Sequence, residues 1–167
     1  HFYCWLQIYK EAVILKIAYL HCIGGISGDM LLGAIVDSGI SITELSAALV
    51  PLGTRGYSLQ ANKDSRGGVT GTLVGVDLEP DAIAPGDISQ FIKIVEQSDL
   101  PSRIIESATS IFRRLGEAES KAHDFSGDSI QLHELGTLDT LVDVVGSVLG
   151  LDMLGIEKLF CSPLPLG

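Results

Sequence analysis

The feature that most constrains the fold is an apolar strand pattern that runs through a glycine-rich turn into a helix pattern. Residues 14–22, ILKIAYLHC, are rich in β-forming side chains and predict a buried strand. The turn IGGISGD follows, and DMLLGAIVDSG then has the pattern of a helix that stops at Gly39. A strand and a helix in such close succession bury their apolar faces against each other. The sequence therefore predicts an α/β fold.

The rest of the chain predicts further helices and strands. Residues 41–53 predict a short helix, which Ser41 or Thr43 can cap. Residues 57–79 predict two or three strands with a break at 64–71. The remaining elements are three helices and a closing strand, at residues 88–97, 101–123, 137–154 and 156–164. We expect a mixed sheet flanked by helices in a single domain, with the first and last strands both buried.

Domain boundaries follow from the two ends of the chain. Residues 1–13 begin without a Met and read as an extension, so we assign the domain to residues 14–167. The chain stops abruptly after CSPLPLG, which indicates a piece of a longer protein. Charged residues at Lys10, Glu11 and Lys16 interrupt the apolar N-terminal run, so it does not predict a membrane span.

The charge and the cysteines narrow the class of partner. The formal net charge is −10, and an acidic chain repels phosphate backbones, which argues against nucleic acid as a partner. Carboxylates instead favour hard or borderline cations. The three cysteines form no C-x-x-C pair and no even framework, which predicts a reducing, cytoplasmic setting without a thiolate zinc site.

The glycine-rich turn is the first candidate site. A strand, GGISGD and a helix in succession leave free backbone N–H groups at a helix N-terminus, where an anion can bind. Ser27 could add a hydroxyl group, but the carboxylate of Asp29 would repel a bare phosphate. Asp29 is therefore either a helix cap or a ligand of a cation that carries the phosphate. The turn matches neither a Walker loop nor G-x-G-x-x-G.

A second candidate site lies in QLHELGTLDTLVDVVG, residues 131–146. Asp139 and Asp143 are four residues apart and share one helix face, where their like charges repel. A divalent cation would relieve that repulsion, and His133 with Glu134 just before the helix would complete a ligand set suited to nickel, manganese, zinc or iron. A solvated helix edge with a capping Glu and a core His explains the same pattern. His123, ten residues earlier, can likewise favour the dipole at its helix end.

Taken together, the two stretches resemble the LarC-type nickel insertion proteins. YLHCIGGISGDMLLGAIVDSG is similar to that family's Y-L-D-C-F-S-G-I-S-G-D-M opening with its L-G-A and D-x-G elements. AESKAH, QLHELGTLDTLVDVVG and SPLPLG resemble its A-E-A-x-V-H, H-F-H-E-V-G-A-x-D-x-I-V-D-I-V-G and S-P-L-P-L-G elements. The departures are His21 in place of an Asp, Gln131 in place of the first His of H-F-H-E, and DAIAPGDI where the family has H-R.

The resemblance implies an activity. Members of the family install nickel in pyridinium-3,5-bisthiocarboxylic acid mononucleotide, the cofactor of lactate racemase and related enzymes. The reaction is a CTP-dependent cyclometallation of the lyase class, and manganese or magnesium supports binding of the nucleotide. A second, C-terminal domain completes the family protein, so this chain would be most of the N-terminal region. The implied partners are the pyridinium mononucleotide, CTP, the C-terminal domain and a lactate racemase-type apoenzyme, with oligomers possible and no membrane.

The resemblance also implies roles for particular residues. Ser27, Gly28 and Asp29 match the G-I-S-G-D-M element and are expected to bind the cofactor. The implied metal ligands are His123, His133, Asp139 and Asp143. His133 or Glu134 would be the catalytic base that removes the pyridinium C–H proton. We expect the turn at residues 24–29 and the helix start near His133 to lie at the same end of the sheet.

Two other readings stay open from the residues alone. Asp29, Asp139 and Asp143 would also suit a metal-dependent nucleotide hydrolase or phosphotransfer domain. A non-catalytic domain that binds metal or a partner would carry the same carboxylates without turnover.

Overall fold

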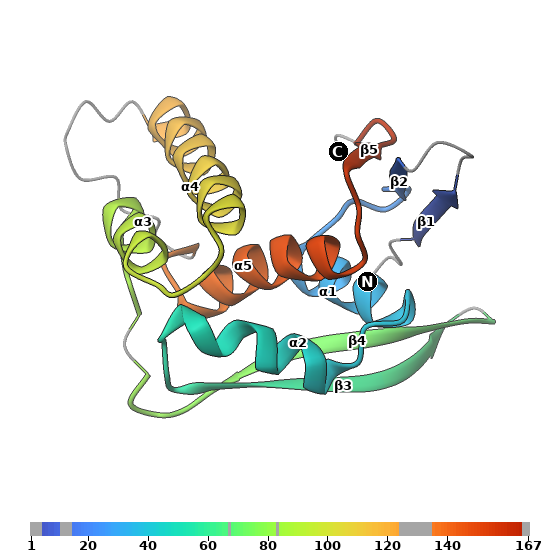
Figure 1. Ribbon diagram of the computed structural model, residues 1–167, viewed down its shortest axis with the longest axis horizontal. Coiled ribbons are helices and arrows are strands. Elements are labelled where there is room, and N and C mark those ends of the chain that lie inside the picture. The colour runs from blue at the N-terminus through green and yellow to red at the C-terminus, as the bar shows by residue number, and fades with distance from the viewer. Residues whose placement is uncertain (1–4, 11–14, 67, 83, 124–134, 165–167) are drawn as a thin grey trace.

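A computed structural model describes residues 5–10, 15–66, 68–82, 84–123 and 135–164. It contains the predicted mixed sheet, built from β1 (Trp5–Lys10), β2 (Lys16–His21) and β5 (Lys158–Cys161). The central strand β2 pairs antiparallel with β1 and parallel with β5. A separate antiparallel hairpin is formed by β3 (Tyr57–Arg66) and β4 (Val69–Leu78), with Tyr57 opposite Leu78. Figure 1 shows the hairpin and the mixed sheet as two distinct parts of the molecule.

Each predicted helix is present near its expected bounds. The helices are α1 (Gly28–Asp37), α2 (Ile42–Leu49), the 3-10 turn η1 (Val50–Leu52), α3 (Ile88–Glu96), α4 (Ser102–His123) and α5 (Leu138–Met153). Local chemistry sets their ends. Ser41 and Glu44 form a reciprocal capping box at α2, and Asp87 and Thr137 accept backbone N–H bonds at the starts of α3 and α5. Gly39, with φ of +116°, follows the end of α1, as predicted.

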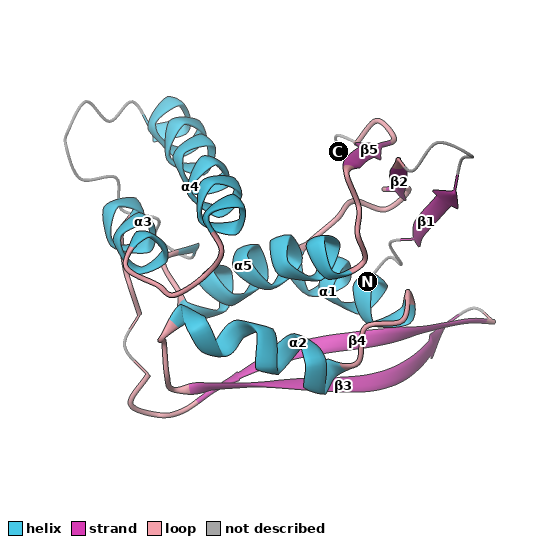
Figure 2. Ribbon diagram, in the orientation of Figure 1, coloured by secondary structure: helices cyan, strands magenta, loops and turns pink. Residues whose placement is uncertain are grey.

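Helix α5 lies at the centre of the molecule (Figures 1 and 2). It contacts α1, α2 and α4, while α1 and α2 in turn rest on the β3–β4 hairpin. Its buried side chains join those of α3 and α4 in the main core, which includes Phe91, Phe112, Leu138, Leu141, Val142, Val145 and Leu149. A smaller core of Leu32, Leu45 and Val74 lies between α1, α2 and the hairpin. The apolar band predicted for α5 is therefore its packing face.

Small residues let α1 approach its neighbours closely. A Cβ on Gly33 would lie 2.2 Å from the backbone oxygen of Thr72 in β4, and one on Gly150 would lie 2.6 Å from Ile35 Cγ2. Both distances are shorter than any normal contact, so only glycine fits at either position. These two contacts fix α1 between the hairpin and α5, and so set where the N-terminus of α1 lies.

One feature of the sheet differs from expectation. The closing strand β5 was predicted to be buried, but all four of its residues are exposed because it lies at the sheet edge, where among the described residues it pairs only with β2. The first predicted strand does contribute buried side chains, at Ala18 and Leu20. Strand β1 falls within residues 1–13, which were assigned to an extension, and pairs with β2; that domain boundary remains a prediction.

No helix in the described ranges is both long enough and apolar enough to cross a membrane.

Candidate functional site

The glycine-rich turn leads into α1, whose first turn carries the side chain that accepts a backbone N–H there, Asp29. Ser27 is the N-cap residue of α1, yet its hydroxyl makes no bond to the helix backbone and instead donates to Asp29 Oδ1. The same oxygen accepts the backbone N–H of Met30 at 2.9 Å. Asp29 thus occupies the positive end of the α1 dipole, where a carboxylate is favourable. Both of these contacts use Oδ1 of Asp29.

Gly28 brings the start of α1 directly against α5. A Cβ at Gly28 would lie 2.2 Å from Asp143 Oδ2 and 2.5 Å from Asp143 Cβ, so any other residue would collide with the Asp143 side chain. The start of α1 and the first two turns of α5 therefore lie together, while the predicted proximity of the glycine-rich turn to His133 stays a prediction. His133, the residue by which that expectation was framed, lies outside the described residues.

Three carboxylates meet at this junction. Asp143 is half-buried, and burial together with the nearby charges of Asp139 and Asp29 raises its pKa to about 7. Burial and the charge of Asp29 also raise the pKa of Asp139, although this side chain is largely exposed. The charge of Asp29 therefore disfavours the charged form of both Asp139 and Asp143. We refer to Asp29, Asp139 and Asp143 as the acidic trio.

Asp143 is the most constrained member of the acidic trio. Its Oδ1 atom is buried and accepts no hydrogen bond from the described residues. A buried carboxylate oxygen without a donor costs about 1–3 kcal/mol or more, and native structures seldom leave one in this state without a purpose. A cation bound at Oδ1 of Asp143 would satisfy this atom and offset the repulsion from Asp29 and Asp139. The acidic trio is therefore suited to a positively charged ligand and is a poor site for a bare phosphate.

The described residues do not provide a complete metal site. Among them, no group of three or more His, Cys, Asp and Glu side chains is placed so that it could hold a metal ion by itself. His133 and Glu134, the predicted catalytic pair, lie outside the described residues, and so does the side chain of His123, whose backbone ends α4. Of the predicted metal ligands, the structure thus places the side chains of Asp139 and Asp143 only.

The structure regroups the predicted residues. Asp29 was assigned to cofactor binding and Asp139 and Asp143 to metal, yet the charge of Asp29 raises the pKa of both other carboxyl groups. His21, at the end of β2, packs edge-on against Tyr19 with ring centroids 4.8 Å apart. Sequence reasoning did not find the role of Gly28 as the spacer for Asp143, because nothing local marks a glycine that faces a residue more than a hundred positions away.

Comparison with known proteins places the chain in a family. Residues 18–167 match the family model described as nickel insertion protein. A relative from Roseiflexus castenholzii, named as a nickel insertion protein, is 42% identical over 152 residues, which cover 91% of this chain and 38% of that protein. A Desulfitobacterium hafniense relative, named pyridinium-3,5-bisthiocarboxylic acid mononucleotide nickel insertion protein, is 41% identical over 92% of this chain and 38% of its own length.

The chain thus spans less than half the length of these relatives. No solved structure matches it. A family match that covers nearly the whole chain, together with identities of about two fifths, leads to one conclusion: the chain belongs to the nickel insertion protein family.

Proposed function

We propose that this chain forms part of an enzyme that inserts nickel into pyridinium-3,5-bisthiocarboxylic acid mononucleotide, and that the acidic trio handles the nickel ion. The observation that carries the proposal is the Asp143 carboxylate, held half-buried against two other carboxylates with one oxygen unsatisfied. The Desulfitobacterium hafniense relative, which bears that substrate in its name, supports the choice of substrate.

The chemistry of the acidic trio suits a metal ion that must be passed on. Carboxylate oxygens bind a borderline cation less tightly than a closed thiolate cage does, so they release it more readily to sulfur ligands of the substrate. Asp143 is substantially protonated near neutral pH, and a nickel ion must displace that proton. Because the acidic trio is an incomplete ligand set, His133 and His123 remain the proposed additional ligands.

The proposed reaction forms nickel–carbon and nickel–sulfur bonds on the pyridinium ring. A base must take the ring C–H proton as the nickel–carbon bond forms, and His133 or Glu134 is proposed for that role. We further propose that insertion depends on CTP with manganese or magnesium, that Ser27, Gly28 and Asp29 contact the substrate or the nucleotide, and that the product serves lactate racemase-type enzymes.

Calorimetric titration tests the metal site directly. Nickel and manganese are titrated into the chain with and without CTP, and into an Asp139→Ala, Asp143→Ala double variant. We expect the double variant to lose at least about tenfold in nickel affinity, the equivalent of about 1.4 kcal/mol. The matched control is Asp77→Ala, Asp81→Ala, which removes two exposed carboxylates and so changes the net charge equally.

The outcomes separate the alternatives. Equal nickel affinity in both double variants would remove the acidic trio from the metal site. Turnover of CTP without nickel transfer to the pyridinium substrate would instead favour the nucleotide hydrolase reading. Circular dichroism of each variant confirms that it is folded before its affinity is compared.

A further inference from the structure

An exposed apolar surface covers one end of the mixed sheet. In β5, Leu159 is 42% exposed and Phe160 is 53% exposed. Phe160 pairs with Tyr19 of β2 and lies on the sheet face opposite the buried residues Ala18 and Leu20. Leu159 pairs with Ala18 and lies on the other face, so exposed apolar side chains flank the edge strand β5 on both sides. Figure 1 shows β5 and β2 at the far end of α5 from α3. In a chain with a net charge of −10, large apolar side chains exposed on an edge strand mark a candidate interaction surface.

Two further exposed apolar side chains lie in the segments that follow β2 and β5. The backbone N–H of Cys22 donates to Ser162 Oγ at 2.9 Å, and Ser162 N donates to Leu20 O at 2.9 Å. These two bonds hold the segments after β2 and β5 side by side. Ile23 is 80% exposed on the first segment, and Leu164 is 53% exposed on the second. Ile23, Leu159, Phe160 and Leu164 are referred to here as the β5 patch.

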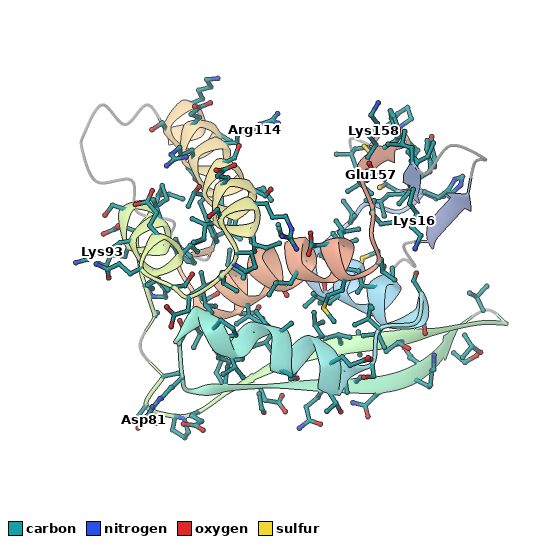
Figure 3. All side chains as sticks on the ribbon, viewed as in Figure 1. Lys16, Asp81, Lys93, Arg114, Glu157 and Lys158 are labelled. Atoms are coloured by element: carbon teal, nitrogen blue, oxygen red, sulfur yellow. The ribbon has the colours of Figure 1, made fainter. Side chains whose placement is uncertain are left out.

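The opposite end of the sheet is fixed by contacts within the chain. Lys16 Nζ donates to Leu154 O at 2.6 Å, and Glu157 N donates to Lys16 O at 2.8 Å. Figure 3 shows Lys16, Glu157 and Lys158 together near β5. The sheet is thus tied to the end of α5 at its amino end, whereas its carboxyl end presents apolar side chains to solvent.

We propose that the β5 patch is the surface on which the rest of a full-length nickel insertion protein packs. The matched stretch is only 38% of the Roseiflexus castenholzii and Desulfitobacterium hafniense relatives, so most of each relative has no counterpart among the residues of this structure. Of the surfaces that the described residues present to such a further part, an apolar edge strand with an exposed aromatic side chain is the best suited to a stable contact.

The place of the β5 patch gives this contact a consequence for the site. Ile23 lies six residues before Asp29, so their Cα atoms are at most about 20 Å apart. A protein part packed over Ile23 would thus lie within about 20 Å of Asp29, a span that a loop of that part can bridge to contribute ligands. The docking surface itself does not depend on the metal chemistry, and the Asp139→Ala, Asp143→Ala variant is expected to keep it.

Hydrogen–deuterium exchange tests the proposal in a full-length protein. In the Roseiflexus castenholzii relative, the stretch that matches this chain is replaced by this chain, and the rest of the relative is kept. Amide exchange is then measured in the chimera and in this chain alone. We expect the amides of β5, Ser162 and Leu164 to exchange at least about tenfold more slowly in the chimera, because the contact shields them from solvent.

Matched variants decide whether the β5 patch makes the contact. Leu159→Ser with Phe160→Ser should abolish the added protection, whereas Ile111→Ser should leave it intact, since Ile111 has the same 42% exposure as Leu159 but lies on α4. Unchanged exchange at β5 in the chimera would overturn the proposal. The proposal would also be overturned if the isolated chain formed a dimer in sedimentation and its β5 amides were as protected as those of the chimera. A second copy of the chain would then cover the β5 patch.

Discussion

At the scale of single residues, the site depends on one carboxyl group that the fold holds in an unfavourable environment. Asp143 is half-buried, faces two like charges and has an oxygen without a hydrogen bond from the described residues. Gly28 makes this arrangement possible, since a side chain there would displace Asp143. Burying this carboxylate without a partner destabilises the fold, and a bound cation would remove that destabilisation.

The raised pKa of Asp143 predicts a particular dependence of stability on pH. Its folded-state pKa of about 7 lies above the usual range of an aspartate, so the folded state binds more protons than the unfolded state between about pH 4 and pH 7. The free energy of unfolding of the metal-free chain should therefore fall as pH rises through that range. Asp143→Asn removes this group, so urea unfolding at pH 5 and pH 8 should show a smaller fall for the variant.

An exposed aspartate provides the control for this measurement. Asp77→Asn should follow the pH profile of the parent chain, because Asp77 lies on the surface of β4. Parallel profiles for the parent and Asp143→Asn would show that Asp143 ionises normally in the folded state.

At the scale of elements, helix α1 positions the site because it is held from both sides. Gly33 lets it approach β4, and Gly150 of α5 receives Ile35. Asp37, at its last turn, accepts the backbone N–H of Thr72 at 2.8 Å and pairs with Lys63, so the C-terminus of α1 is tied to the hairpin. With these contacts fixed, the N-terminus of α1 can only meet α5 beside Asp143.

Enlarging Gly33 should loosen this arrangement. Gly33→Ala puts a methyl group on the Thr72 backbone oxygen, which cannot rotate away as a flexible side chain would. We expect the free energy of unfolding to fall by about 1–3 kcal/mol, despite the better helix propensity of alanine. Urea denaturation at pH 7 measures the change. Gly75→Ala in β4, where nothing lies within 4 Å of the added Cβ, should be far milder, and equal losses would contradict the close-packing argument.

At the scale of the whole molecule, α5 connects the parts that matter for function. It contributes the main core, carries two members of the acidic trio and ends where Lys16 ties the mixed sheet to it. Arg103 of α4 forms a bidentate salt bridge with Asp152, near the C-terminus of α5. Binding at the acidic trio should therefore stabilise the fold as a whole, because the site exists only when α1 and α5 are packed together.

Nickel should accordingly raise the stability of the chain. A ligand that binds the folded state alone stabilises it by about 2.7 kcal/mol at a hundredfold excess over its Kd. We expect the urea midpoint to rise with the logarithm of the nickel concentration, less steeply than the ideal because the four histidines of the unfolded chain also bind nickel. Asp139→Ala, Asp143→Ala should abolish most of the rise, whereas Asp77→Ala, Asp81→Ala should keep it. A rise of the same size in both variants would place the stabilising nickel elsewhere.

The helices, the hairpin, strand β2 and the family could all be predicted from the sequence alone. These follow from signals within a few residues of one another: helical spacing in α4, the capping box at Ser41, the glycine after α1 and the motif letters around Asp29 and Asp139. Two findings came from the fold alone: β5 is exposed, and Gly28 is the spacer that lets α1 approach Asp143. The reason is physical, because these outcomes depend on contacts between residues more than a hundred positions apart, and the local preferences that form a helix or strand do not specify which surfaces will meet.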